Sequence, residues 1–88
     1  MKREVHIASC VVYARPEVVD DVVRHIRQQQ IAEVHATDSR GRIVIVLEGP
    51  GEASIIGSIE AIRALPGVLA VHLVYQHCEE EDALQEAL

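Results

Sequence analysis

The chain has 88 residues, enough for one domain, and hydrophobic residues make up 49% of it, which argues against disorder over most of its length. Its formal net charge of −6 argues against a general binder of nucleic acid or of anionic membranes and favours cationic partners. With two Tyr and no Phe or Trp, it also lacks the aromatic platforms on which single-stranded RNA binders stack bases.

The first residues predict no export signal. Residues 1–4 run directly into a strand-like segment, without the apolar region and small-residue cleavage site of a secretory signal. No apolar run approaches the roughly 20 residues that span a bilayer. The two cysteines, Cys10 and Cys78, are far apart and indicate no disulfide framework. We therefore expect a cytoplasmic protein that does not insert into a membrane.

The first half of the chain predicts a strand, a helix and a second strand. Residues 6–13 are rich in the apolar and small side chains that suit a strand. Residues 16–27 begin with a proline suited to a first helical turn, and their valines and isoleucine recur at the spacing of one helical stripe. Residues 31–37 predict a strand with Val34 and Ala36 on one face. Its other face would hold Glu33, His35 and Thr37.

The second half repeats this order. Residues 38–41 are a turn signal, so the strand predicted at 42–48 forms a hairpin with the strand before it. Residues 52–65 contain an isoleucine stripe and predict a helix, which a Pro-Gly pair ends. Residues 67–75 give the clearest strand pattern of the chain. Alternation there predicts a core face of Leu69, Val71, Leu73 and Tyr75, and an opposite face of Ala70, His72 and Val74.

This β-α-β-β-α-β order predicts an α+β fold, the ferredoxin-like split βαβ sandwich. In that fold two helices cover one face of a four-stranded antiparallel sheet, and the apolar stripes of both predicted helices need such a partner. We expect this domain to occupy residues 1–78 and an acidic carboxyl-terminal tail to follow at residues 79–88.

The face of the predicted sheet that no helix covers is the candidate binding surface. An error of one residue in the first or third strand would exchange its members with those of the core. The side chains expected on it are Ser9, Val11, Tyr13, Val44, Val46, Ala70, His72 and Val74. The second strand would add Glu33, His35 and Thr37.

No pattern in the chain is typical of a catalytic or metal site. No Cys-x-x-Cys occurs, and adjacent residues of a strand, such as His77 and Cys78, point to opposite faces. The serines lie in no nucleophile motif, and residues 49–51 lack the lysine and the spacing of a phosphate-binding loop. We therefore expect no metal, no cofactor and no enzymatic activity.

Several short stretches together resemble a known family. The most specific are residues 67–71, Gly-Val-Leu-Ala-Val, followed by Leu-Val-Tyr at 73–75, and Ser9 followed by Val-Val-Tyr-Ala at 11–14. With its loop lengths and acidic tail, the chain resembles the NapD family from about His6 to about Glu81. These are small cytoplasmic chaperones of the catalytic subunit of the periplasmic nitrate reductase.

The resemblance implies a binding function without catalysis. Members of that family bind the twin-arginine signal peptide of the nitrate reductase precursor and delay its export until the molybdenum cofactor is loaded. The peptide binds as a helix against the sheet surface. In this chain, expected to be a monomer, the uncovered face would take the apolar stretch of the peptide. Acidic rim residues would attract the arginine pair: Glu48, Glu79, Glu80, Glu81 and Asp82.

Two other functions are compatible with the same element order. A regulatory module of the ACT type would pair two sheets side by side and bind an amino acid at the interface. An acylphosphatase-like enzyme would need an arginine in a phosphate-binding loop after the first strand, together with a catalytic asparagine. Arg15 is in roughly that place, but the chain contains no asparagine.

Overall fold

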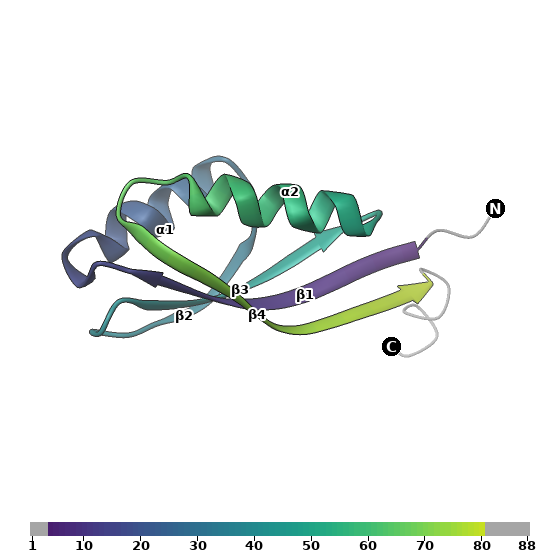
Figure 1. The fold of residues 1–88 in the computed structure, drawn as a ribbon, viewed down its shortest axis with the longest axis horizontal. Helices are drawn as coiled ribbons and strands as arrows, with labels where there is room; N and C mark the ends of the chain where they lie inside the picture. Colours follow the sequence, from purple (N-terminus) through teal and green to yellow (C-terminus); the bar gives the residue numbers. More distant parts are fainter. Residues whose placement is uncertain (1–3, 81–88) are drawn as a thin grey trace.

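The structure is a computed structural model and describes residues 4–80. In these residues, four strands and two helices follow one another (Figure 1). In chain order the elements are β1 (Glu4–Ala14), a 3-10 turn η1 (Pro16–Val18), α1 (Val19–Gln28), β2 (Glu33–Thr37), β3 (Arg42–Gly49), α2 (Glu52–Arg63) and β4 (Val68–Glu80). The predicted β-α-β-β-α-β order is confirmed. Strand β4 continues two residues beyond the expected end of the domain at 78, and the expected tail from 81 onwards lies outside the described residues.

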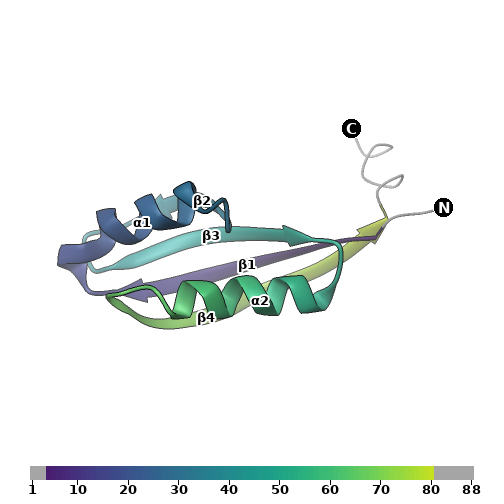
Figure 2. The same cartoon turned by 90° about the horizontal axis from the view of Figure 1, so that it is seen from above.

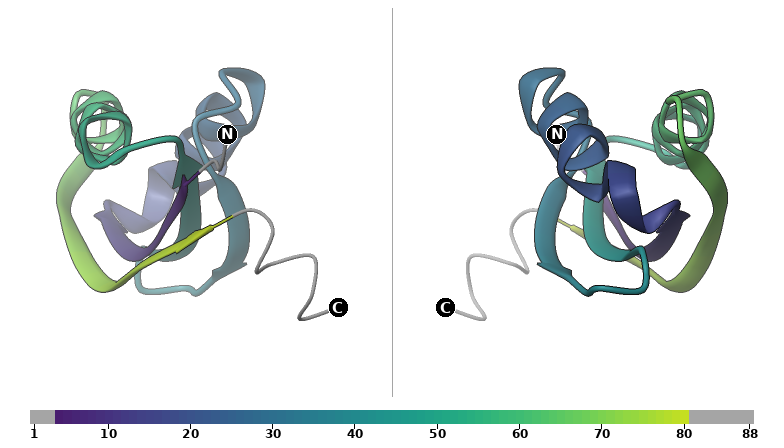
Figure 3. Two further views of the ribbon diagram at one scale, coloured as in Figure 1. Left: turned by 90° about the vertical axis from the view of Figure 1, so that its right-hand side faces the viewer. Right: turned by 90° about the vertical axis from the view of Figure 1, so that its left-hand side faces the viewer.

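The sheet has the strand order β2-β3-β1-β4, and every neighbouring pair is antiparallel. Both helices lie on one face of it, which the two end views show clearly (Figure 3). Seen from above, α2 runs beside β4 and α1 lies on the side of β2 and β3 (Figure 2). We call the face opposite the helices the open face, because no described element covers it. Among the described residues, no helix is long and apolar enough to cross a membrane.

The core fills the space between the sheet and the helices. Side chains at most 3% exposed come from both central strands and both helices: Ala8, Cys10, Val12, Ala14, Val22, Ile26, Ile43, Ile45, Leu47, Ile55 and Ile62. Burial of each valine, leucine or isoleucine contributes about 1.5–3 kcal/mol to folding. Alternate residues of β1 and β3 point away from the helices. The structure therefore puts on the open face the residues that alternation predicts there: Ser9, Val11, Tyr13, Val44 and Val46.

Strand β4 departs from simple alternation at two bulges. Opposite β1, the register skips Leu69, and it skips Val74 between Leu73 and Tyr75. A bulge adds one unpaired residue, and it therefore moves every later residue to the other face. The predicted core face of β4 is correct for Val71 but wrong for Leu69, which is 68% exposed.

Of the two remaining members of that predicted face, Leu73 keeps the predicted side of β4, and only Tyr75 follows the bulge at Val74. Leu73 lies opposite the buried Cys10 but stays largely exposed, because β4 is an edge strand with a neighbour on one side only. Tyr75 takes the register position opposite Ser9, a residue of the open face. Bulges on edge strands are a common protection against pairing with another chain.

Strand β2 contains a third bulge, at His35. Val34 lies opposite the buried Ile45, whereas Ala36 lies opposite Val44 of the open face. The prediction that Val34 and Ala36 share a face is therefore wrong. Glu33 lies opposite Val46, on the open face as predicted.

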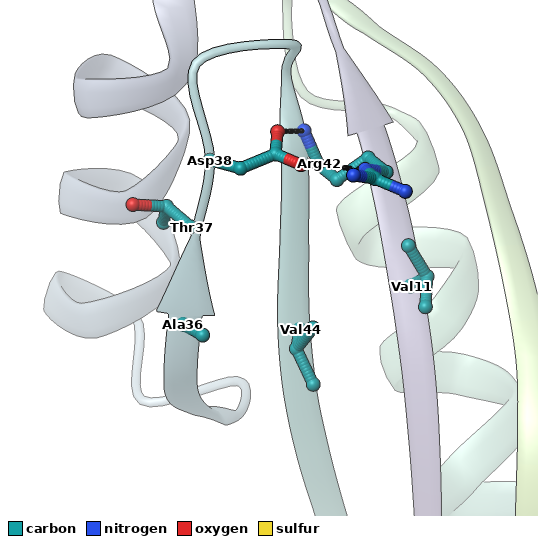
Figure 4. A pocket seen from close by; sticks show the side chains of 6 residues that line it. All are labelled: Val11, Ala36, Thr37, Asp38, Arg42 and Val44. Atoms are coloured by element: carbon teal, nitrogen blue, oxygen red, sulfur yellow. Dashed lines mark hydrogen bonds and ion pairs between the residues drawn. The ribbon is translucent and has the colours of Figure 1, made fainter.

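The bulge also moves Thr37 off the predicted face. It lies opposite the core residue Ile43, and its side chain points away from Val44 (Figure 4).

Candidate functional site

The open face is organised in rows that run across the strands. Directly opposite residues of an antiparallel pair project to the same side, so the register defines each row. From the β2–β3 hairpin towards the far end of the sheet, the rows are Ala70, Tyr13 and Arg42; then His72, Val11, Val44 and Ala36; then Ser9, Val46 and Glu33; and last Ile7 and Glu48. Charged side chains occur at both ends of this series, and the rows between them are mainly apolar and small.

The middle of the open face is a shallow apolar surface. Val44, on the central strand β3, is 38% exposed, and Val11 beside it on β1 is half-buried. A hollow of about 260 Å³ lies over this pair and reaches the hairpin, with Ala36, Thr37, Asp38 and Arg42 completing its lining (Figure 4). Because Val11, Ala36 and Val44 are short or β-branched, a helix or strand laid on them can approach the backbone closely.

An aromatic pair flanks this surface on the β4 side. The rings of Tyr13 and His72 are tilted by 59°, with their centroids 5.0 Å apart. Tilted contacts between rings stabilise a structure beyond the contribution of the surface area that they bury. His72 occupies the row of Val11 and Val44, so its ring offers a larger side wall than a small polar residue would.

The hairpin end of the open face has a carboxylate that is already engaged. The backbone N–H groups of Arg40 and Arg42 donate to Asp38 Oδ1 at 2.9 and 3.0 Å, and Arg42 Nε donates to Asp38 Oδ2 at 2.5 Å. The hydrogen bond from the backbone N–H of Arg42 is the main cause that lowers the pKa of Asp38, and the other two bonds lower it further. Figure 4 shows the Arg42 side chain extending from β3 towards β1.

The far end of the open face is acidic. Glu33 and Glu48 are exposed and line a hollow of about 240 Å³ together with Gln30, Ile31, Ala32 and Val46. Of the predicted acidic rim, Glu48 therefore lies beside the open face. Glu79 and Glu80 belong to the same end of β4, because their backbones lie opposite Val5 and Glu4. Glu81 and Asp82 lie outside the described residues.

The structure gathers most of the side chains that the sequence predicts for this surface. There are three exceptions. Val74 and His35 are unpaired residues of bulges and lie in no row, and Thr37 lies opposite the core residue Ile43.

Three members of the surface were missed: Ile7, Arg42 and Ala36. Ile7 could have been found by continuing the alternation of β1 by two residues. Arg42 could have been found by continuing the alternation of β3 by two residues, whereas Ala36 could not, because nothing in the sequence marks the bulge at His35.

Among the side chains that the structure describes, no group of three or more His, Cys, Asp and Glu is placed to hold an ion. The side chains of His77 and Cys78 are not among them. Cys10 lies in the core on the helix side of β1, and burial raises the pKa of its thiol. His72 lies on the opposite side of the sheet.

The family is decided by comparison with known proteins. The family described as NapD protein matches residues 5–80. The chain belongs to the NapD family. It is 36% identical to Chaperone NapD of Paracoccus pantotrophus over 85 residues, which are 93% of this chain and 75% of that protein. It is 34% identical to Chaperone NapD of Escherichia coli strain K12 over 76 residues, which are 85% of this chain and 87% of that protein.

A solved NapD protein has the same fold. The solution structure of the E. coli Tat proofreading chaperone NapD aligns with a TM-score of 0.78 at 34% identity, covering 92% of this chain and 85% of that one. The fold is thus ferredoxin-like, as predicted. The resemblance to NapD is confirmed, and the named relatives make this chain a chaperone of the Nap system, a non-enzymatic role. They do not support the ACT-type or the acylphosphatase-like alternative.

Proposed function

We propose that this chain binds the twin-arginine signal peptide of the catalytic subunit precursor of the periplasmic nitrate reductase. It does so in the cytoplasm, as a monomer, and delays export of the precursor until its cofactor is loaded. The peptide occupies the open face as a helix. The observation that supports this most directly is an uncovered sheet face whose apolar middle rows end in exposed carboxylates.

The dimensions of the open face suit a single helix. Neighbouring strands are about 4.8 Å apart, and a helix with its side chains is about 10–12 Å wide, so a helix covers two to three strands. Centred on β1 and β3, it would rest on Val11, Val44 and Val46, with the ring of His72 along one side. Docking of the apolar side of an amphipathic helix against a hydrophobic surface is a common mode of peptide recognition.

Charge agrees with this partner. A twin-arginine peptide is basic at one end, and the chain has a net charge of −6. The exposed carboxylates beside the open face increase the association rate and its salt dependence, while the apolar rows determine how long the peptide stays bound. The solved E. coli relative is a Tat proofreading chaperone, and its role supports the same class of partner for this chain.

The test is calorimetric titration with the twin-arginine signal peptide of a periplasmic nitrate reductase catalytic subunit. Val44→Arg places bulk and a positive charge in the middle of the open face, and we expect it to weaken binding at least tenfold. Ile56→Arg makes a comparable change on α2, where Ile56 is 49% exposed, and should leave the affinity within twofold of the parent.

Two results would count against the proposal. Equal affinity of Val44→Arg and the parent would show that the peptide binds elsewhere. Failure of the parent to bind the peptide would remove the proposed function itself. Both variants alter partly exposed side chains, so their melting temperatures should stay close to that of the parent and serve as the folding control.

A further inference from the structure

The open face has a direction, because its two ends differ in charge. At the acidic end, Glu33 and Glu48 are exposed and share one hollow. At the hairpin end, the carboxylate of Asp38 already accepts hydrogen bonds from Arg40 and Arg42. A cationic group arriving at the hairpin end therefore meets an Arg42–Asp38 ion pair. One arriving at the acidic end meets the exposed carboxylates of Glu48 and of Glu33, whose Oε2 also lies 3.8 Å from Nε2 of His35.

We propose, building on the function proposed above, that the signal peptide lies in one orientation only, with its arginine pair over Glu33 and Glu48. Its apolar stretch then runs towards the row of Tyr13 and Ala70. In a signal peptide the basic region precedes the apolar region. The bound helix therefore runs in the same direction as β1, which begins at the acidic end and finishes beside the hairpin.

The length of the face fits this arrangement. Along β3, Arg42 and Glu48 are about 20 Å apart at roughly 3.3 Å per residue. A helix covers that distance with about 13 residues at 1.5 Å each. An arginine pair at one end and an apolar stretch of about three turns therefore occupy the acidic end and the apolar rows together.

The opposite orientation would bring unfavourable contacts at both ends. The arginine pair would lie beside Arg42, whose ion pair with Asp38 leaves no free carboxylate to receive it, and the apolar stretch would end over the exposed carboxylates of Glu33 and Glu48. Like charges brought together at a binding surface are strongly unfavourable and suppress incorrect arrangements. The contact between Tyr13 and His72 also places two ring surfaces where the proposed orientation puts apolar side chains.

Paramagnetic broadening in methyl NMR spectra tests the orientation directly. Two peptides carry a nitroxide through a thioether bond, one beside the arginine pair and one at the far end of the apolar stretch. We expect the first to weaken the methyl signals of Val46 and Ile7 most strongly. The second should act most strongly on Ala70 and Val11.

The possible outcomes separate this inference from the function on which it rests. The reverse pattern would overturn the orientation and leave peptide binding on the open face intact. Equal broadening by both peptides would show that two orientations coexist, which also contradicts the inference. Broadening confined to methyls of the helices, in a complex that forms, would overturn the location of the site and with it the orientation.

A charge cycle gives a second, independent test. Replacing Glu33 and Glu48 by glutamine should weaken binding of the parent peptide two- to fivefold at low salt. The loss should disappear when the two arginines of the peptide are replaced by glutamine. Glu60→Gln, an exposed change on α2, is the matched control and should have no such effect. A loss that is the same for both peptides would show that these carboxylates do not contact the arginine pair.

Discussion

Two neighbouring valines of β1 test the assignment of the sheet faces. Val12 is 0% exposed and lies opposite Ile43 and Val71, both core residues. Val11 is half-buried and lies opposite Val44 and His72 on the open face. Threonine has the shape of valine and keeps its branch at Cβ, so replacement changes neither the volume nor the preference for a strand.

The expected difference comes from the hydroxyl group. Burying a hydroxyl among apolar side chains costs about 1–3 kcal/mol, so Val12→Thr should lower the free energy of unfolding by about 2 kcal/mol. In Val11→Thr the hydroxyl stays in contact with water, so the free energy of unfolding should change by less than about 0.5 kcal/mol. Against a total stability of roughly 5–15 kcal/mol, both variants should still fold.

Urea unfolding followed by circular dichroism measures both changes. The slope of the free energy against urea should match that of the parent, since the surface exposed on unfolding is unaltered. In a thermal melt, Val12→Thr should lose roughly 8–16 °C, at about 4–8 °C per kcal/mol for a domain of this size. Equal losses for the two variants, or a larger loss for Val11→Thr, would refute the face assignment.

Three further predictions follow from local geometry. Gly41→Ala should destabilise the domain by about 1–3 kcal/mol, because the φ of Gly41 is 97° and an added Cβ would meet a backbone carbonyl oxygen. Gly57→Ala should stabilise the domain by about 0.5–1 kcal/mol, because the added Cβ meets open space in α2. Denaturant melts that rank the two variants the other way would contradict this. Asp38→Asn should lower the free energy of unfolding at neutral pH. Because the pKa of Asp38 is lowered in the folded protein, the difference between the variant and the parent should vanish as the pH falls through that pKa. A difference in unfolding free energy that stays constant with pH would disprove this prediction. In a Cys78→Ser variant, the buried, raised-pKa thiol of Cys10 should react with an aromatic disulfide reagent only as fast as the protein opens, and immediate labelling of the native protein would be inconsistent with its burial.

The element order of the fold could be predicted from the sequence, whereas the faces of its two central strands were open to an error of one residue. Strands β1 and β3 lie in the middle of the sheet, and each buries alternate residues under the helices. Apolar residues occupy both faces of these strands, at Val11 and Val12 and throughout residues 43–47, so the register and burial in the structure are what place Val11, Val44 and Val46 on the open face. The helices show the period of 3.6 residues because each packs one apolar stripe against the sheet.

The edge strands could not be predicted to the same degree. Each of the bulges, at His35, Leu69 and Val74, lies in β2 or β4. No glycine or proline is near His35 or Val74, and the Pro66-Gly67 pair before Leu69 indicates the end of the preceding helix. An edge strand pairs on one side only, so an extra residue disturbs few bonds and leaves little trace in the sequence. Alternation extended through these points gave the wrong side for Ala36 and Leu69.

The charge direction of the open face depends on register as well. The sequence indicates a hairpin between β2 and β3, but it does not show that Glu33 lies opposite Val46 or that Glu48 lies opposite Ile7. Those pairings bring the two carboxylates to one end of the face. The engagement of Asp38 with Arg42 at the other end is likewise a product of the turn geometry.

Methyl NMR spectra of the isotope-labelled chain, recorded while the twin-arginine signal peptide is added, test the central claim most directly. The account predicts the largest shifts at Val11, Val44 and Val46, on the open face, and unchanged signals from Ile56 on the exposed side of α2. Large shifts at Ile56, with the open-face methyls unmoved, would place the peptide on the helical layer and contradict the account.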